Sequence, residues 1–361
     1  MSGGLVDWGL AGRIAVTVAG GDDGGRANGH AEPAILRPEG LEPVCAQALE
    51  LVRSYSRLEP VGTIPAPEPV GRAEWSRGVL QTMRELATEL ERRGTLDISL
   101  PGPLGRIGRS VVGVGLATEV GVAAGYAARR VLGQYDVSLL GPDRPARLLF
   151  VVPNLTGAAA SMEVDSGDFV RWVALHETTH AVQFASAPWL RDHLGGLIRR
   201  LLGGAATEVS IGQLVRRVAR DPKGAVASFA RGDAAKALLG ESQAPVLERI
   251  QATMTVIEGH AEHVMDGAAD EFVGDVAGLR AKLEARRRQR GPLETILSKI
   301  LGLDLKLRQY ELGKGFCDEV TAEGGIEALN RIWDGSDAMP SEAELRDPGS
   351  WLERIRTRVT Q

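Results

Sequence analysis

The segment His176-Glu177-Thr178-Thr179-His180 carries residue types whose spacing suits metal-assisted hydrolysis. On an α-helix, a spacing of four residues places the two imidazoles on one face, with Cβ atoms roughly 5–6 Å apart. Both imidazoles can then bind one Zn²⁺, while Glu177 accepts a proton from a water molecule that the metal activates. We therefore expect a zinc-dependent hydrolase, in the first place a metallopeptidase, with His176 and His180 as metal ligands and Glu177 as the general base.

A catalytic zinc site needs a third protein ligand, and the sequence next to the motif does not supply one. The metzincin extension requires Gly and His where this chain has Gln183 and Ser186. The dense cluster of ligand-type residues further along the chain is EGHAEHVMD, from Glu258 to Asp266. We expect Glu258 to be the third ligand. Gly259 after it lets another backbone approach closely, and Glu-Gly resembles the zinc-ligand pair of helical aminopeptidases of the gluzincin type.

Other members of this cluster remain alternatives for the third ligand. Glu262 with Asp266 makes the thermolysin-like ExxxD spacing, and His263 offers an imidazole. The carboxylates of the cluster share a helix face at i, i+4, so one can bind zinc while another orients a ligand imidazole. For the oxyanion of a tetrahedral intermediate, Tyr310, His263 and His260 are candidate hydrogen-bond donors.

The element that must position the motif is a long helix that follows a short strand. Asp165 or Ser166 can cap a helix that continues without a breaker up to Pro188. Before it, residues 147–152 (RLLFVV) have the apolar, β-branched pattern of a strand. The best candidate partner for this strand is the segment 97–100. The position of the strand, just before the motif helix, suits pairing with an extended substrate.

Helical periodicity dominates the rest of the chain. The four prolines within residues 59–72 predict a connector rather than a regular element. We therefore expect a mainly α fold, of the α+β type with a small sheet, in which HExxH lies on a long central helix. The domain prediction is a single large domain over residues 1–361, with an N-terminal helical subdomain, residues 1–140, and a catalytic part, residues 141–361.

Charge and apolar patterning disfavour two classes of partner. A net charge of -5 offers no general attraction for nucleic acid or for an anionic membrane. The apolar, Gly-rich stretch 110–129 contains Glu119 near its middle, which disfavours a membrane span. Its Gly121 and Gly125 indicate instead a helix that a neighbouring helix approaches closely.

Cysteine usage and the first residues bear on the compartment. Cys45 and Cys317 form neither a disulfide framework nor a thiolate zinc site, and no secretory leader pattern is present. We expect a cytoplasmic protein whose partner is a peptide or small amide substrate, with no nucleic acid and no membrane partner. The oligomeric state stays open.

The chain resembles the zincin-like metallopeptidases of type 2, a bacterial family whose members are commonly named as hydrolases. The version IEGHAEHVMD is similar to the branch named for association with deazaflavin coenzyme biosynthesis. The resemblance implies a zinc site at His176 and His180, with Glu177 as the base and Glu258 as the further ligand, and it leaves the substrate blank. It extends along nearly the whole chain, through VDWGLA near Asp7, VLGQYDVSLL from Val131, LLFVVPN from Leu148, DFVRWVALHETTHAVQFASAPWL from Asp168, IEGHAEHVMD from Ile257 and GLDLKLRQYELGKGF from Gly302.

Two other functions compete with the peptidase hypothesis. The first stays within zinc chemistry and is an amidohydrolase that acts on a small metabolite or cofactor precursor. The second is a zincin-like scaffold that keeps the helix, with or without the metal, but catalyses no reaction. Metal content and the fate of peptides as substrates separate the three hypotheses.

Overall fold

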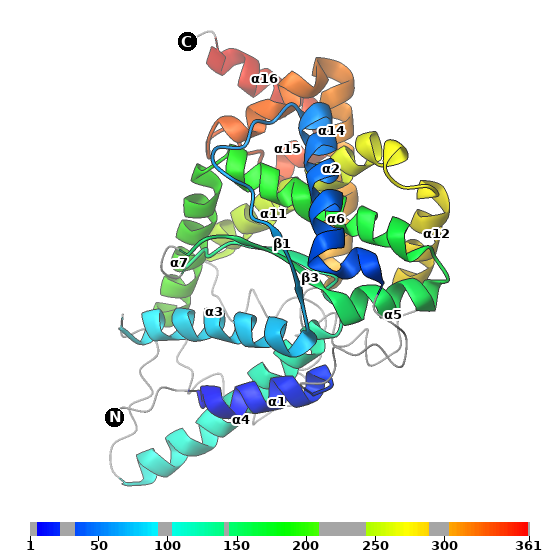
Figure 1. The fold of residues 1–361 in the computed structure, drawn as a ribbon. Helices are drawn as coiled ribbons and strands as arrows, with labels where there is room; N and C mark the ends of the chain where they lie inside the picture. The colour runs from blue at the N-terminus through cyan, green and yellow to red at the C-terminus, as the bar shows by residue number, and fades with distance from the viewer. Residues whose placement is uncertain are drawn as a thin grey trace. The chain divides into compact units, whose positions relative to one another are not determined.

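The computed structural model describes residues 6–21, 33–92, 103–140, 144–208, 243–288 and 303–359. Within them the fold is mainly helical with one small sheet, as the sequence predicts (Figure 1). The elements up to the motif helix are α1 (Trp8–Ala19), η1 (Ala34–Leu36), α2 (Pro38–Ser56), β1 (Pro67–Val70), α3 (Arg72–Arg92), α4 (Pro103–Ala128), β2 (Gly133–Asp136), β3 (Arg147–Val151), α5 (Val152–Met162) and α6 (Ser166–Ser186). The elements after it are α7 (Trp189–Glu208), α11 (Ala244–Ala268), η3 (Ala269–Glu271), α12 (Val276–Arg288), α14 (Leu303–Asn330), η4 (Arg331–Asp334), α15 (Glu342–Arg346) and α16 (Pro348–Val359).

The chain forms two compact units that alternate along the sequence. The first unit consists of Met1–Cys45 with Pro65–Ala174, and the second of Ala46–Ile64 with Leu175–Gln361. The boundaries of these units differ from those predicted for the N-terminal subdomain, residues 1–140, and the catalytic part, residues 141–361. The division into these two parts stays a prediction. Helices α2 and α6 each begin in the first unit and end in the second.

The sheet lies in the first unit and has the strand order β1-β3-β2. β1 runs parallel to β3 and β2 runs antiparallel to it. The prediction of a connector over residues 59–72 is wrong at its end, because Pro67–Val70 forms a strand. Prolines at every second position lack their N–H groups on the same side of a strand. An edge strand tolerates them, because that side can face away from the neighbouring strand.

The predicted strand at residues 147–152 is confirmed as β3, but its partners are not the expected ones. Both of its sides are paired, so β3 is the central strand and has no side left for an extended substrate. The segment 97–100 lies outside the described residues. The suggestion that β3 pairs with a substrate is therefore wrong.

The helices of the first unit pack through small residues. α1 lies against α4, and α3 contacts both (Figure 1). A Cβ atom added to Gly121 would lie 2.6 Å from the Ala11 carbonyl oxygen, and one added to Gly125 would lie 2.5 Å from that of Ala15. This confirms the predicted close approach of a helix. Among the described residues, none of the helices combines the length and apolar character that crossing a membrane requires.

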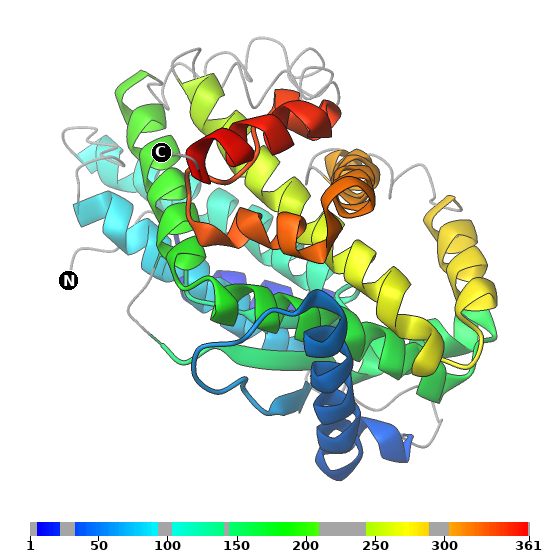
Figure 2. The ribbon, with the colours of Figure 1, turned by 90° about the horizontal axis from the view of Figure 1, so that it is seen from above.

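In the second unit α11 contacts α7 and α14, and it passes between them in Figure 2. A Cβ atom on Gly259 would lie 2.1 Å from the carbonyl carbon of Gly313, which confirms the close backbone approach predicted for Gly259. Around the same helices, the indole of Trp351 packs edge-on against Phe316, with ring centroids 5.3 Å apart. This buried aromatic pair joins α14 to α16 within the second unit.

Local capping explains where the motif helix begins and ends. Oδ1 of Asp165 accepts a hydrogen bond from the backbone N–H of Asp168 at 2.8 Å, as the N-cap prediction requires. The helix ends at Ser186, before Pro188, as predicted.

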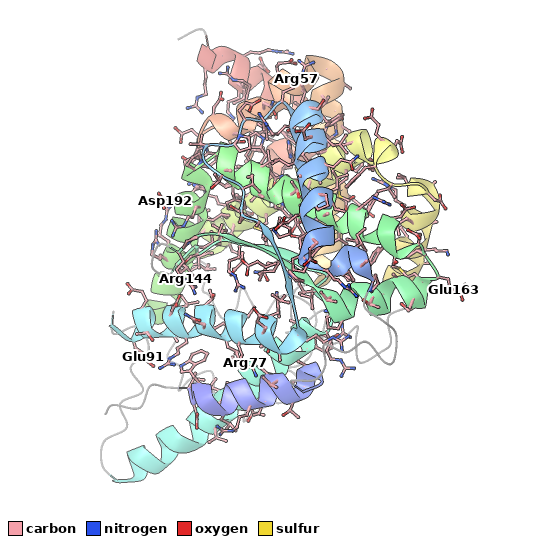
Figure 3. All side chains as sticks on the ribbon, viewed as in Figure 1. Arg57, Arg77, Glu91, Arg144, Glu163 and Asp192 are labelled. Carbon is pink, nitrogen blue, oxygen red and sulfur yellow. The ribbon has the colours of Figure 1, made fainter. Side chains whose placement is uncertain are left out.

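Charged side chains elsewhere are mostly exposed, including Arg77 on α3 and Asp192 on α7 (Figure 3).

Candidate metal centre

His176, His180 and Glu258 each bring one ligand-type atom to a common point within the second unit. The Nε2 atoms of the two histidines lie 3.1 Å apart. Oε2 of Glu258 lies 3.7 Å from Nε2 of His176 and 3.5 Å from Nε2 of His180. All three atoms fall within 4.8 Å of one another. α6 supplies both imidazoles, one helical turn apart, and α11 supplies the carboxylate.

The spacing of these atoms fits a tetrahedral zinc ion. With ligand bonds of about 2.0–2.2 Å, two ligand atoms of such an ion are roughly 3.3–3.6 Å apart. The observed separations of 3.1, 3.5 and 3.7 Å bracket that range. Two imidazole nitrogens and one carboxylate oxygen are also a donor set that catalytic zinc sites use, with a fourth position left for water or substrate.

Two buried carboxylates make this point favourable for positive charge. Only 7% of Glu177 and 8% of Glu258 is exposed. Burial by itself lowers the pKa of His180, but the hydrogen bond and charge of Glu258, together with the charge of Glu177, raise it to about 9. A buried carboxylate is costly without a cationic neighbour, so the site favours a cation between its ligand atoms.

The outer ring nitrogens of the two histidines, their Nδ1 atoms, contact different side chains. Nδ1 of His180 lies 2.9 Å from Oε1 of Gln183, which is fully buried on the same helix. Nδ1 of His176 lies 3.3 Å from Sδ of Met265 on α11. An amide oxygen is a good hydrogen-bond acceptor and a thioether sulfur a weak one, so the Nδ1 contact of His180 is the stronger of the two.

The other carboxylates of the α11 cluster do not join this group. Glu262 is half-buried and lies outside the three-residue group found among the described residues. Asp266 forms ion pairs with Arg280 and with Lys314, the latter at 2.9 Å. The prediction that a second carboxylate of the cluster orients a ligand imidazole is therefore wrong, because Gln183 and Met265 occupy those positions.

His263 takes part in a separate hydrogen-bond network. Its Nδ1 lies 2.7 Å from Oδ1 of Asp318, while its Nε2 lies 3.2 Å from the Tyr55 hydroxyl and 3.3 Å from that of Thr321. Burial alone raises the pKa of Asp318, but hydrogen bonds from Lys314 and His263 lower it. Both ring nitrogens of His263 are thus engaged away from the three-residue group, and its catalytic role stays a prediction.

The remaining oxyanion candidates have different positions. His260 is fully buried, and its Nδ1 lies 3.0 Å from Nε2 of Gln183. Burial, followed by the neighbouring His263 and His180, lowers the pKa of His260 to about 3, so that its ring is neutral. The side chain of Tyr310 lies outside the described part of the structure.

Sequence reasoning missed Gln183 as a contributor to the site. In the sequence, this position only shows that the metzincin glycine is absent. The available signal was its spacing of three residues after His180, which puts both side chains on one helix face. Tyr55 and Asp318 carried no comparable signal, because they come from distant segments.

Comparisons with known proteins identify the family of the chain. The model of the zincin-like metallopeptidase family matches residues 6–352. A crystal structure from Chloroflexus aurantiacus, described as a "putative hydrolase with a novel fold", is 26% identical with a TM-score of 0.67, and the match covers 97% of this chain and 99% of that chain. A search of curated proteins gives no match. Since the family model spans nearly the whole sequence and includes the HExxH helix and Glu258, the chain belongs to the zincin-like metallopeptidase family.

Proposed function

We propose that the protein is a zinc-dependent peptidase that hydrolyses amide bonds. The observation that carries this proposal is the convergence of His176, His180 and Glu258 on one point, with the carboxylate-bearing Glu177 buried beside them on α6. These three residues would hold the ion. When bound, Zn²⁺ supplies a Lewis acid that polarises a carbonyl group and makes water more acidic.

Glu177 provides the proton transfer that hydrolysis requires. It follows His176 directly on α6, so the turn that binds the metal also carries the base. Its carboxylate accepts a proton from the attacking water molecule and then donates that proton to the nitrogen of the leaving amine. Glu177 is thereby returned to its ionised form after each turnover.

The variant Glu177→Gln tests this assignment. It should retain about one zinc per chain yet lose at least about 100-fold in the rate of peptide hydrolysis, because the amide cannot accept the proton. Zinc is measured by elemental analysis and hydrolysis by mass spectrometry of a peptide library. An unchanged rate would remove Glu177 from the mechanism. A library left intact by the wild-type protein, beside a changed metabolite extract, would favour a small-molecule amidohydrolase.

A matched pair of variants on α11 tests the third ligand. Glu258→Gln should weaken zinc binding by at least about 100-fold, since a charged ligand is replaced by a poor one. Glu262→Gln, one helical turn further on, removes a carboxylate that lies outside the group and should leave the zinc affinity unchanged. The reverse result would assign the ligand to Glu262. Absence of zinc from the wild-type protein under zinc-replete conditions would favour a non-catalytic scaffold.

A further inference from the structure

Gln183 on α6 makes one contact with His180 on its own helix and two contacts with α11. Its Oε1 lies 2.9 Å from Nδ1 of His180. Its Nε2 lies 2.8 Å from the carbonyl oxygen of Ile257 and 3.0 Å from Nδ1 of His260. Gln183 and His260 are both 0% exposed, so water does not replace any of these partners.

Hydrogen-bond chemistry fixes the direction of every link. The Ile257 carbonyl can only accept, so the amide atom beside it must be the NH₂ group of Gln183. The other amide atom is then the oxygen, which can only accept, so Nδ1 of His180 must carry the hydrogen. In the neutral ring this leaves the lone pair on Nε2, the atom that faces Glu258 and Nε2 of His176.

His260 prevents the amide from taking the opposite orientation. The second N–H of the Gln183 NH₂ group points to Nδ1 of His260, which therefore accepts. A flipped amide would place its oxygen against the Ile257 carbonyl oxygen and leave both acceptors without a donor. The His260 ring is itself fixed by the indole of Trp333, which it meets at 88° with ring centroids 5.1 Å apart.

The Nδ1 contact of His176 is of a weaker kind. This nitrogen faces the thioether sulfur of Met265 at 3.3 Å, and a thioether accepts a hydrogen bond only weakly. In metal sites, loss of such an outer hydrogen bond commonly weakens metal binding by about 10–100-fold.

We propose that Gln183 is a positioning residue that holds His180 in the Nδ1–H tautomer, with the Ile257 carbonyl and His260 fixing the amide. The inference rests on the proposed zinc-binding function. An amide suits this position better than a carboxylate, because it can donate to two acceptors on α11 while it accepts from His180. A carboxylate would also add a further negative charge beside Glu177 and Glu258.

The zinc affinity of Gln183→Leu tests the proposal, measured by competition with a chelating dye. Leucine has a similar volume and no hydrogen-bonding group, so zinc should bind about 10–100-fold more weakly than in the wild-type protein. The matched control is Thr179→Val on the same helix. The Thr179 hydroxyl is buried and donates to the Leu175 carbonyl at 2.8 Å, within its own helix, so this variant should keep the wild-type affinity. Equal affinities of wild-type protein and Gln183→Leu would overturn the proposal.

A second measurement separates positioning from a general loss of structure. In zinc-loaded protein with ¹⁵N-labelled histidine, the Nδ1–H of His180 should give a slowly exchanging proton signal in the wild type and in Thr179→Val. The signal should be lost in Gln183→Leu. A Gln183→Leu protein that folds and keeps this signal would overturn the proposal. If the wild-type protein itself binds no zinc, the proposed function fails, whereas unaltered binding in Gln183→Leu defeats this inference alone.

Discussion

The helix pairs α1–α4 and α11–α14 use the same packing device in the two units but carry different chemistry. In the first pair Gly121 and Gly125 face the backbone of α1, and in the second Gly259 faces Gly313 across the crossing. The residues around the first crossing are mainly alanines and other apolar side chains. In the second pair, Gly259 is flanked by a candidate metal ligand and by His260, whose Nδ1 contacts Gln183.

This difference shows that close packing and chemistry are separable features of a helix pair. Glycine at a crossing lets two backbones approach within contact distance, which fixes the register of one helix against the other. In the first unit that precision serves only the core. In the second unit it also places Glu258 opposite the histidines of α6, since α11 cannot shift without moving its carboxylate.

Gly259→Ala should have the largest effect, because it disrupts the crossing of α11 and α14. The added Cβ would lie 2.1 Å from the carbonyl carbon of Gly313, and backbone cannot move aside as a flexible side chain can. We expect a loss of about 3 kcal/mol in the free energy of unfolding, measured with urea, and at least about 100-fold weaker zinc binding. Wild-type zinc affinity in a folded Gly259→Ala protein would show that the crossing does not position the site.

Gly121→Ala makes the same change in the first pair. Its Cβ would lie 2.6 Å from the Ala11 carbonyl oxygen and 2.9 Å from Cβ of Ile14, so α1 must shift. We expect a loss of about 2 kcal/mol in unfolding free energy, with zinc affinity unchanged. Comparable zinc loss in Gly121→Ala and Gly259→Ala would mean that packing and metal binding are not separable as stated.

Glu344→Gln tests whether any destabilisation of the second unit weakens zinc binding. Burial alone raises the pKa of Glu344, but hydrogen bonds from Arg354 and from the backbone and hydroxyl of Ser341 lower it below 4.5. A lowered folded pKa gives stability that is present above pH 4.5 and is lost as the pH falls through the folded value. The variant should therefore lose about 1 kcal/mol at pH 7, and this difference should shrink below pH 4.5.

Two measurements complete that test. Urea unfolding at several pH values gives the stability difference, and a deficit that grows as the pH falls would contradict the assigned sign. Zinc affinity at pH 7 should equal that of the wild type, because α15 contributes no residue to the three-residue group.

Arg147→Met should have the smallest effect. Arg147 pairs with Glu68 at 2.5 Å and links β3 to β1 in the first unit, but both side chains are about 40% exposed (39% and 42%). Solvent screening limits such a pair to roughly 0.5 kcal/mol. Urea unfolding should show a shift of this size that disappears in high salt; a loss as large as that of Gly121→Ala would contradict this ranking.

The sequence predicted the features that depend on local patterns. The HExxH spacing, the Asp165 cap and the breaker at Pro188 are all contained within one stretch of chain, and the structure has the helix they predict. Gly259 was also identified correctly, because glycine beside ligand-type residues in a helix indicates a close neighbour.

Features that depend on distant segments were missed or wrongly assigned. The prolines of β1 predict a connector from sequence alone, and they are compatible with a strand only because β1 pairs with β3 on one side. The outer contacts of the histidines went to Gln183 and Met265, whose roles depend on how α11 approaches α6. The residues next to Gln183 and Met265 in the sequence do not indicate how α11 approaches α6.

X-ray absorption spectroscopy of the zinc-loaded protein measures directly whether His176, His180 and Glu258 bind the metal. We expect a four-coordinate zinc with two imidazole nitrogens from His176 and His180, one carboxylate oxygen from Glu258 and one further light atom, at about 2.0–2.2 Å. The variant Glu258→Gln should lose this spectrum. A sulfur ligand, an all-oxygen six-coordinate shell or a spectrum unchanged in Glu258→Gln would contradict it.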